Sequence, residues 1–202
     1  MEDSNFSERF ECRKDLHQYW YSQKTIDFLV SECQHNPEWK VGFLSTPSVF
    51  FSLTNPITMQ NAVCFEYDPK FDQKDGRFVL YDFNHPENIP KAYHGSFDLL
   101  VIDPPYITRE VWLKYAEAIT MLLKKDAKLI ISTLDDNAEM IKELTGCKKR
   151  VFRPYISTLI YQFAFYTNYE SDGWGRENEE IPKVDAEAEE KRVLKILGLD
   201  FD

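Results

Sequence analysis

Residues 97–112 read FDLLVIDPPYITREVW, an apolar run that passes directly into an acid, two prolines and a tyrosine. Four consecutive apolar residues, 99–102, are typical of a strand buried on both faces inside a parallel sheet. The strand must end at Asp103, because Pro104 and Pro105 have no N–H for a ladder and restrain the residues before them to extended conformations. In open α/β sheets, ligands bind at the carboxyl ends of the strands. The stretch therefore predicts a rigid loop at a binding edge.

The rest of the chain alternates between strand-like and helix-like patterns. Strands are expected at Val41–Leu44 and at residues 62–67, 77–81 and 128–132. Helices are expected at residues 16–33, 109–123 and 136–144, with Gly146 placed to close the last one. Two β-rich runs, residues 151–154 and 159–168, flank a polar bend and predict a hairpin. This order predicts an α/β fold, a doubly wound and mostly parallel sheet with an antiparallel C-terminal hairpin.

Composition divides the chain of 202 residues into three parts. Residues 1–14 are predicted to be a polar arm, residues 15–172 one domain, and residues 173–202 an acidic linker with a short amphipathic helix. That helix, at residues 186–199, would have Val193, Ile196 and Leu197 on one side, and a solvated helix is favoured over one that docks on a partner. The domain is large enough to bury a core, because 43% of the chain is hydrophobic and 15% aromatic.

The cysteines and histidines indicate neither a metal site nor a disulfide framework. The four cysteines are scattered without a CxxC pair, and the four histidines form no HxxxH. The amino terminus, MEDSNFSER, is acidic and polar where a signal peptide is basic and then apolar, and no apolar run approaches membrane-spanning length. We therefore expect a cytoplasmic protein in a reducing compartment, without a metal and without a membrane partner.

The charge balance disfavours stable binding of nucleic acid. The formal net charge is −10, which opposes approach to a phosphate polyanion. Residues 177–202 hold nine acidic and four basic residues, which account for half of that charge, and the rest of the chain is still negative. The one notable basic cluster is Lys148, Lys149 and Arg150, and such short clusters are usually only solvated. A basic protein partner is easier to accommodate.

The DPPY loop has a plain structural explanation, a tight turn made of good turn formers. Its context argues for a site instead. The loop follows a buried strand and precedes a helix, and the two strands before it in the chain also end in acids, at Glu66 or Asp68 and at Asp82. Carboxyl ends of parallel strands lie at one edge of a sheet, so these acids are expected to gather beside Asp103.

Asp103, Pro104, Pro105 and Tyr106 match [DNS]PP[YFW], the catalytic loop of the amine-modifying class I S-adenosylmethionine-dependent methyltransferases, which the chain resembles. A closer resemblance is to the eukaryotic elongation factor 1A lysine methyltransferase 1 family. It rests, in chain order, on QYWYSQKT (18–25), FLSTPSVF (43–50), FEYDPKF (65–71), YDFNHP (81–86) and IDPPYIT (102–108). The family was earlier labelled as N6-adenine-specific DNA methyltransferases because of the same loop. The resemblance covers about residues 15–172 and leaves the acidic tail outside.

This resemblance implies a Rossmann-like class I methyltransferase fold with a seven-stranded sheet and S-adenosyl-L-methionine as cofactor. It also implies methyl transfer to a lysine of elongation factor 1A. The short loops and the lone sheet predict a monomer. The catalytic residues would be Asp103, Pro104, Pro105 and Tyr106. Asp103 and the Pro104 carbonyl would hold and aim the amine, and Tyr106 would stack against the chain that carries it.

The strand ends supply the expected cofactor contacts. Glu66 would accept hydrogen bonds from the ribose hydroxyls, and Asp68 is the alternative if the register differs by one pleat. Asp82 would accept from the adenine amino group, with Phe83 against the ring, and Asp103 would border the cofactor as well. Trp20, Tyr21 and Ser22 resemble the family element that covers the cofactor, although aromatic residues on a helix are more often core.

The loop after the first strand departs from the superfamily pattern. Most class I methyltransferases have a glycine-rich E/DxGxG turn there, since glycine lets the backbone approach the cofactor. This chain has Ser45, Thr46, Pro47 and Ser48 instead, and only seven glycines in all. The named family carries the same glycine-poor loop, so the resemblance implies that these four residues lie at the cofactor.

Two alternatives stay open. DPPY alone does not distinguish a lysine amine from an adenine amine, because both present an N–H to the same acceptors, so an N6-adenine methyltransferase acting on DNA or RNA is the first alternative. That enzyme would want a basic surface, which this chain lacks beyond its one short cluster. The second is a methyltransferase-fold protein that has lost catalysis and only binds a partner, against which the intact DPPY argues.

Overall fold

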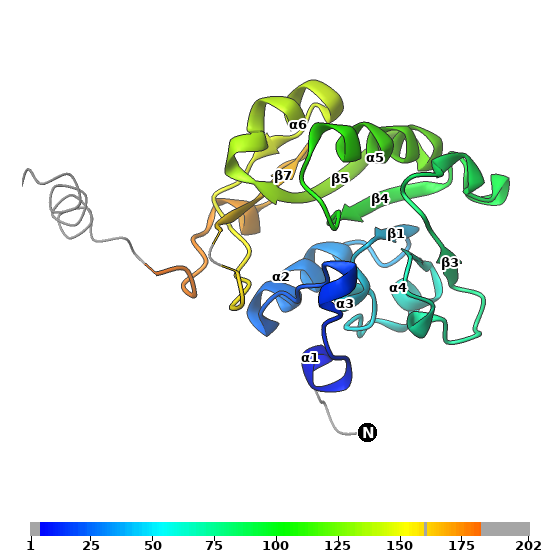
Figure 1. Ribbon diagram of the computed structural model, residues 1–202, viewed down its shortest axis with the longest axis horizontal. Coiled ribbons are helices and arrows are strands. Elements are labelled where there is room, and N and C mark those ends of the chain that lie inside the picture. Colours follow the sequence, from blue (N-terminus) through cyan, green and yellow to red (C-terminus); the bar gives the residue numbers. More distant parts are fainter. Residues whose placement is uncertain (1–4, 160, 183–202) are drawn as a thin grey trace, which may run out of the picture.

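The computed structural model describes residues 5–159 and 161–182, and in it seven strands form one sheet (Figure 1). The strands are β1 (Val41–Leu44), β2 (Ala62–Glu66), β3 (Phe78–Leu80), β4 (Phe97–Ile102), β5 (Leu123–Leu134), β6 (Lys148–Lys149) and β7 (Phe163–Thr167). Their order is β3-β2-β1-β4-β5-β7-β6. The first five are parallel, whereas β7 is antiparallel to both β5 and β6. The predicted doubly wound, mostly parallel sheet with antiparallel C-terminal strands is confirmed.

Helices cover both faces of this sheet (Figure 1). They are α1 (Phe6–Arg9), α2 (Gln23–Cys33), α3 (Pro47–Phe50), α4 (Pro56–Gln60), α5 (Arg109–Leu122) and α6 (Ala138–Thr145). The side of α2 and α3 holds one hydrophobic cluster and the side of α5 and α6 holds another, and alternate residues of β4 enter them in turn. Leu99 and Val101 join the first cluster, and Leu100 and Ile102 join the second. The continuous apolar run of β4 is explained by this burial on both faces.

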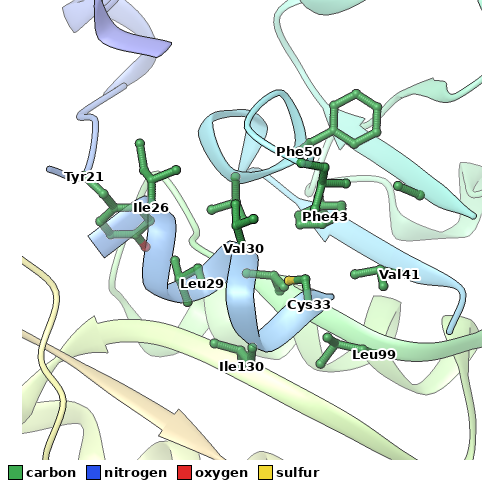
Figure 2. Packing of buried hydrophobic residues seen from close by; sticks show 14 of the residues in the cluster. Tyr21, Ile26, Leu29, Val30, Cys33, Val41, Phe43, Phe50, Leu99 and Ile130 are labelled. Atoms are coloured by element: carbon green, nitrogen blue, oxygen red, sulfur yellow. The ribbon is translucent and has the colours of Figure 1, made fainter. Parts of the chain in front are cut away.

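Helix α2 packs on the sheet through one apolar stripe. Figure 2 shows Ile26, Leu29 and Cys33 on the helix, above Leu99 and Ile130 of the strands, and all five side chains are at most 1% exposed. Their spacing along the helix is three and four residues, which brings them to one face. The helix is thereby fixed at the centre of the sheet, directly behind the strand that carries the DPPY loop.

Several boundary predictions were wrong. The strand expected at residues 128–132 is the longer β5, Leu123–Leu134, and the one expected at residues 159–168 is β7, which begins only at Phe163. The helix expected over residues 16–33 starts only at Gln23, because Ser22 caps it by accepting the Thr25 N–H, and His17 before it is left-handed with φ 53°. The strand expected at residues 151–154 is instead β6, at Lys148–Lys149. The N–H groups of Val151 and Phe152 donate to the Trp174 carbonyl rather than to β7, so the chain leaves the sheet there.

The segment that composition indicates as a linker is packed in its first part. Trp174 is 1% exposed and stands edge-on to Phe28 of α2, with ring centroids 4.8 Å apart. Asn178 is buried as well. The packed body therefore continues past residue 172. At the other end, Phe6 of the expected polar arm is also buried. The amphipathic helix expected at residues 186–199 lies outside the described residues.

Candidate active site

A cavity of about 870 Å³ opens at the carboxyl ends of the parallel strands. Ser45 follows β1, Glu66 ends β2, Asp82 lies just after β3 and Asp103 follows β4, and all four line this cavity. Parallel strands necessarily present their carboxyl ends at one edge, which is why these residues meet. Among the sequence-predicted residues, the cavity is lined by Trp20, Ser45, Pro47, Ser48, Glu66, Asp82, Phe83, Asp103, Pro104, Pro105 and Tyr106.

The DPPY loop forms one lip of the cavity. The Asp103 N–H donates to the Leu44 carbonyl at 3.2 Å, which ties the start of the loop to β1. Pro104 is buried, whereas Tyr106 is 42% exposed at the mouth. The His17 ring lies against Tyr106 with centroids 4.6 Å apart, and Phe83 approaches Tyr106 edge-on at 6.1 Å. Three aromatic rings from distant parts of the chain thus border the entrance.

Asp103 has an unusual electrostatic environment. Burial raises its pKa from 3.8 to about 7, and the side chains of Tyr21 and Ser132 oppose part of that rise. Removing a carboxylate from water penalises the charged form, whereas a hydroxyl that donates to it favours that form. Tyr21 does not line the cavity; it is 4% exposed and lies behind Asp103 as its neighbour.

Of the two acids expected at the end of β2, only Glu66 lines the cavity. It is 7% exposed, its carboxylate accepts the Asp68 N–H at 3.1 Å, and burial raises its pKa from 4.5 to about 7. Asp68 turns away and binds the amino-terminal segment. Its carboxylate accepts from the Gln18 side-chain amide at 3.2 Å and lies 3.3 Å from the Lys70 ammonium. Asp68 therefore holds residues 13–18 along the edge of the cavity.

In the glycine-poor loop, the residue with a positive φ is Ser45. This residue adopts φ 57°, the left-handed conformation that glycine ordinarily supplies. Its hydroxyl lies 2.7 Å from the Tyr115 hydroxyl and its N–H donates to the Phe65 carbonyl. Thr46 does not line the cavity, because its side chain is buried and donates to the Val101 carbonyl. A hydrogen-bonded serine holds the strained turn that the superfamily gives to glycine.

The amino-terminal element divides between the cavity and the core. Trp20 lines the cavity, but its indole N–H donates to the Phe10 carbonyl at 2.9 Å and its ring meets Phe6 edge-on. Ser22 caps α2 and does not reach the cavity. Of the three residues predicted to cover the cofactor, only Trp20 borders the cavity, as part of a packed segment.

Several lining residues were not predicted from the sequence, although Gln18 and Tyr81 lie within the family-like stretches 18–25 and 81–86. They are Gln18, Tyr81, Tyr115, Ile156, Leu159, Tyr161 and Phe163, with His17 at the entrance. Tyr81 directly precedes Asp82, and attention to every strand end would have found it. Its hydroxyl is buried and has no hydrogen-bond partner among the described residues. Ile156 and Leu159 lie in an irregular stretch between β6 and β7, which no periodicity marks, whereas Phe163 is the first residue of β7.

The described residues contain no group of three His, Cys, Asp or Glu side chains that could hold a metal ion. In the same part of the chain, every helix is too short or too polar to cross a membrane. The cavity is lined by four carboxylates, those of Asp15, Glu66, Asp82 and Asp103. None of the described residues that line it is a lysine or an arginine. The cavity therefore offers a negative potential, which favours cationic ligands.

Comparison with known proteins gives consistent matches. The family model described as "Probable N6-adenine methyltransferase" matches residues 12–171. EEF1A lysine methyltransferase 1 of Mus musculus is 36% identical over 162 residues, which cover 77% of this chain and 74% of that protein. Protein-lysine N-methyltransferase EFM5 of Saccharomyces cerevisiae is 28% identical over 180 residues, 79% and 73% of the two chains. A solved "putative RNA methyltransferase" from Pyrococcus horikoshii, 13% identical, superposes with a TM-score of 0.51 over 78% of this chain and 88% of its own, and shares the fold.

Proposed function

Because the chain belongs to the family of the EEF1A lysine methyltransferase 1 proteins, we propose that it transfers methyl from S-adenosyl-L-methionine to a lysine of elongation factor 1A. The observation that carries this proposal is the DPPY lip on a cavity whose described lining residues include four carboxylates and no lysine or arginine. Both the sulfonium of the donor and the ammonium of a lysine are cations, so the same negative cavity attracts both.

The cavity fits the donor in size and chemistry. A volume of about 870 Å³ lies within the range of pockets that enclose cofactor-sized ligands. Glu66 offers a buried acceptor for ribose hydroxyls, Asp82 an acceptor for an amino group, and Phe83 an apolar ring. When bound, the donor supplies an electrophilic methyl group on a positively charged sulfur.

Asp103 is assigned to the incoming amine. An ammonium has no free lone pair, so the proton must leave before the nitrogen can attack. Transfer of that proton from a free lysine, pKa about 10.4, to a carboxylate of pKa about 7 costs about 5 kcal/mol, against about 9 kcal/mol for an ordinary aspartate. Burial of Asp103 thus lowers the cost of forming the neutral amine, and the carbonyl oxygens of the protonated Asp103 and of Pro104 then accept the amine N–H groups and aim its lone pair.

Tyr106 is assigned to the chain that carries the amine. Its ring is 42% exposed and stands between His17 and Phe83 at the entrance. A methylammonium product over such a ring face gains about 0.5 to 2 kcal/mol from cation–π attraction. Orientation by this lip supplies more of the rate than acid–base chemistry does.

The description of the family model keeps adenine as the second candidate substrate. Two of the three residues in the basic cluster that a nucleic-acid ligand would use are paired within the protein. Lys149 pairs with Asp135, and Arg150 pairs with Glu170 and donates to the Tyr169 carbonyl. Their pairing within the fold favours the protein substrate.

The test is methyl transfer from labelled S-adenosylmethionine to purified elongation factor 1A, beside a DNA and RNA pool, with mass spectrometry of whatever gains label. We expect label on one or more lysines of the protein and none above background on nucleic acid. Asp103→Ala is the matched inactive control, since it removes the acceptor at the lip. Label on adenine would replace the substrate assignment, and no label on any substrate despite donor binding would favour the non-catalytic alternative.

We further propose that the enzyme works as a monomer in the cytosol. All four cysteines are free thiols, which is the state that a reducing compartment maintains. Size-exclusion chromatography with light scattering tests the monomer, with a mass near 23.9 kDa expected, and imaging of the tagged protein tests the compartment.

A further inference from the structure

Three segments that are far apart in the sequence meet beside the active site. They are the start of α2, residues 153–156 of the loop after β6, and residues 178–182 near the end of the described chain. In Figure 1 the orange C-terminal segment runs beside the yellow loop. The last of these segments lies beyond residues 12–171, which the family model matches.

Thr25 is the centre of this junction. Its side-chain oxygen accepts from the Tyr155 N–H at 3.1 Å and from the Asn178 amide at 3.4 Å. The Asn178 amide also donates to the Arg153 carbonyl at 2.9 Å. Both Thr25 and Asn178 are buried, at 0% and 4% exposure. Asn178 therefore joins the helix to the loop by buried hydrogen bonds, and breaking them would cost free energy because water does not readily replace them.

Ser22 forms the second connection. Its N–H donates to the Tyr155 carbonyl at 2.8 Å, and its hydroxyl donates to the Glu180 carboxylate. The carboxylate of Glu180 is thus bound at the residue that caps α2. A hydrogen bond to a charged acceptor is stronger than a neutral one, so this contact restrains the cap.

The junction lies one residue from two parts of the active site. Tyr21, which lies next to Asp103, directly precedes Ser22, and Figure 2 shows its ring beside Ile26 at the start of α2. Ile156, which lines the cavity, directly follows Tyr155. Pro182 lines a second cavity of about 280 Å³, which shares Ile156, Leu159, Tyr161 and Phe163 with the main one. Loss of the junction would release both Tyr21, the neighbour of Asp103, and Ile156, which lines the cavity.

We propose that Asn178 and Glu180 are positioning residues of the active site, which hold Tyr21 against Asp103 and Ile156 in the cavity wall. The proposal deepens the methyltransferase function given above and rests on it. Neither residue touches the cavity, and both act through Ser22, Thr25 and Tyr155. The segment itself is anchored separately by Trp174 in the core, so removal of one of these side chains loosens the junction while the fold is retained.

The test uses point variants of the full chain. Asn178→Ala removes the two hydrogen bonds that the side-chain amide donates and the one that its oxygen accepts from the Glu180 N–H. Glu180→Ala removes the acceptor of the Ser22 hydroxyl. Glu180→Gln keeps an acceptor oxygen and serves as the conservative rescue. Glu179→Ala is the matched control, because Glu179 pairs with Lys24 at the surface and, within the described part of the chain, makes no hydrogen bond to Ser22 or Thr25.

We measure kcat and KM for the protein substrate, the dissociation constant of S-adenosylhomocysteine, and the melting temperature. Misplacement of reacting groups by a fraction of an ångström supports an expected loss of about tenfold in kcat for Asn178→Ala and Glu180→Ala. We expect Glu180→Gln to recover at least half of the wild-type kcat, and Glu179→Ala to match wild type. Product affinity should change less than about twofold, because Glu66 and Asp82 are not moved.

Hydrogen exchange supplies a readout that needs no substrate. Both Ala variants should exchange faster at residues 153–156 and at Ser22, with β1 and β4 unchanged. If wild type has no activity on elongation factor 1A, the substrate assignment is refuted. Hydrogen exchange alone then tests whether Asn178 and Glu180 hold the junction. The proposal is overturned if both Ala variants keep wild-type kcat or wild-type exchange, or if Glu179→Ala loses as much as they do. If Asn178→Ala does not fold, Glu180→Ala with its Gln rescue decides.

Discussion

The buried carboxyl of Glu66 should make the ligand-free protein less stable as the pH rises. Glu66 is 7% exposed, and burial raises its pKa from 4.5 to about 7. A carboxyl whose pKa is raised by folding contributes its full stability below the unfolded value, here 4.5, and loses it as the pH rises through the folded value, here about 7. Glu66→Gln removes this titration and keeps the shape of the side chain.

The size of the effect follows from the two pKa values. Each pH unit between them changes the free energy of unfolding by about 1.4 kcal/mol, so complete ionisation of Glu66 costs the folded state about 3 kcal/mol. About 2.5 kcal/mol of this loss in unfolding free energy falls between pH 5 and pH 8. Other groups titrate in the same range, Asp103 among them. The difference between wild type and Glu66→Gln cancels their contribution.

The assay is urea unfolding followed by tryptophan fluorescence at pH 5, 6, 7 and 8, without cofactor. The unfolding free energy of Glu66→Gln minus that of wild type should rise by about 2.5 kcal/mol from pH 5 to pH 8. Glu38→Gln, at an exposed carboxyl, is the matched control and should track wild type. A rise below about 0.5 kcal/mol would show that Glu66 is ionised in the folded protein without cost, and the account of its burial would be refuted.

Three further predictions follow from named contacts. Asp103→Ala should lower kcat at least about 100-fold with product affinity within about threefold in calorimetry; near-normal turnover would remove Asp103 from the reaction. Asp68→Asn should weaken S-adenosylhomocysteine binding about fivefold, because it loosens residues 13–18 at the cavity edge; an unchanged isotherm would contradict that. Gly42→Ala places a Cβ 2.5 Å from Leu100 Cδ2 and should cost about 1 to 3 kcal/mol in urea unfolding, whereas wild-type stability would show that Leu100 moves freely.

The strands and the DPPY loop could be predicted because their cause is local. A strand buried on both faces must be apolar throughout, as Leu99 to Ile102 are, and a proline pair must end it. The gathering of Glu66, Asp82 and Asp103 also follows from the chain order, since parallel strands end at one edge. The clustering of these acids could therefore be predicted from the sequence without any measured distance.

Other parts of the site depend on contacts between segments that are distant in the chain. Glu66 and Asp68 are two residues apart and chemically alike, yet one faces the cavity and the other binds Gln18, because the strand ends at Glu66 and Asp68 already caps the short helical turn at Pro69–Phe71. Composition makes the region of Trp174 look like a linker, but its ring fills a gap beside Phe28. Neither outcome has a local signal.

By itself, the sequence determined the sheet, its binding edge and the residues that end its strands, because burial and proline act on short stretches. Only the tertiary structure decided which side chains point into the cavity, that Ser45 adopts the left-handed turn, and that residues 178–180 lie against the start of α2. These features depend on packing between segments that are distant in the sequence; Ser22 and Glu180, for example, are more than 100 residues apart. A periodic pattern carries no information about such contacts.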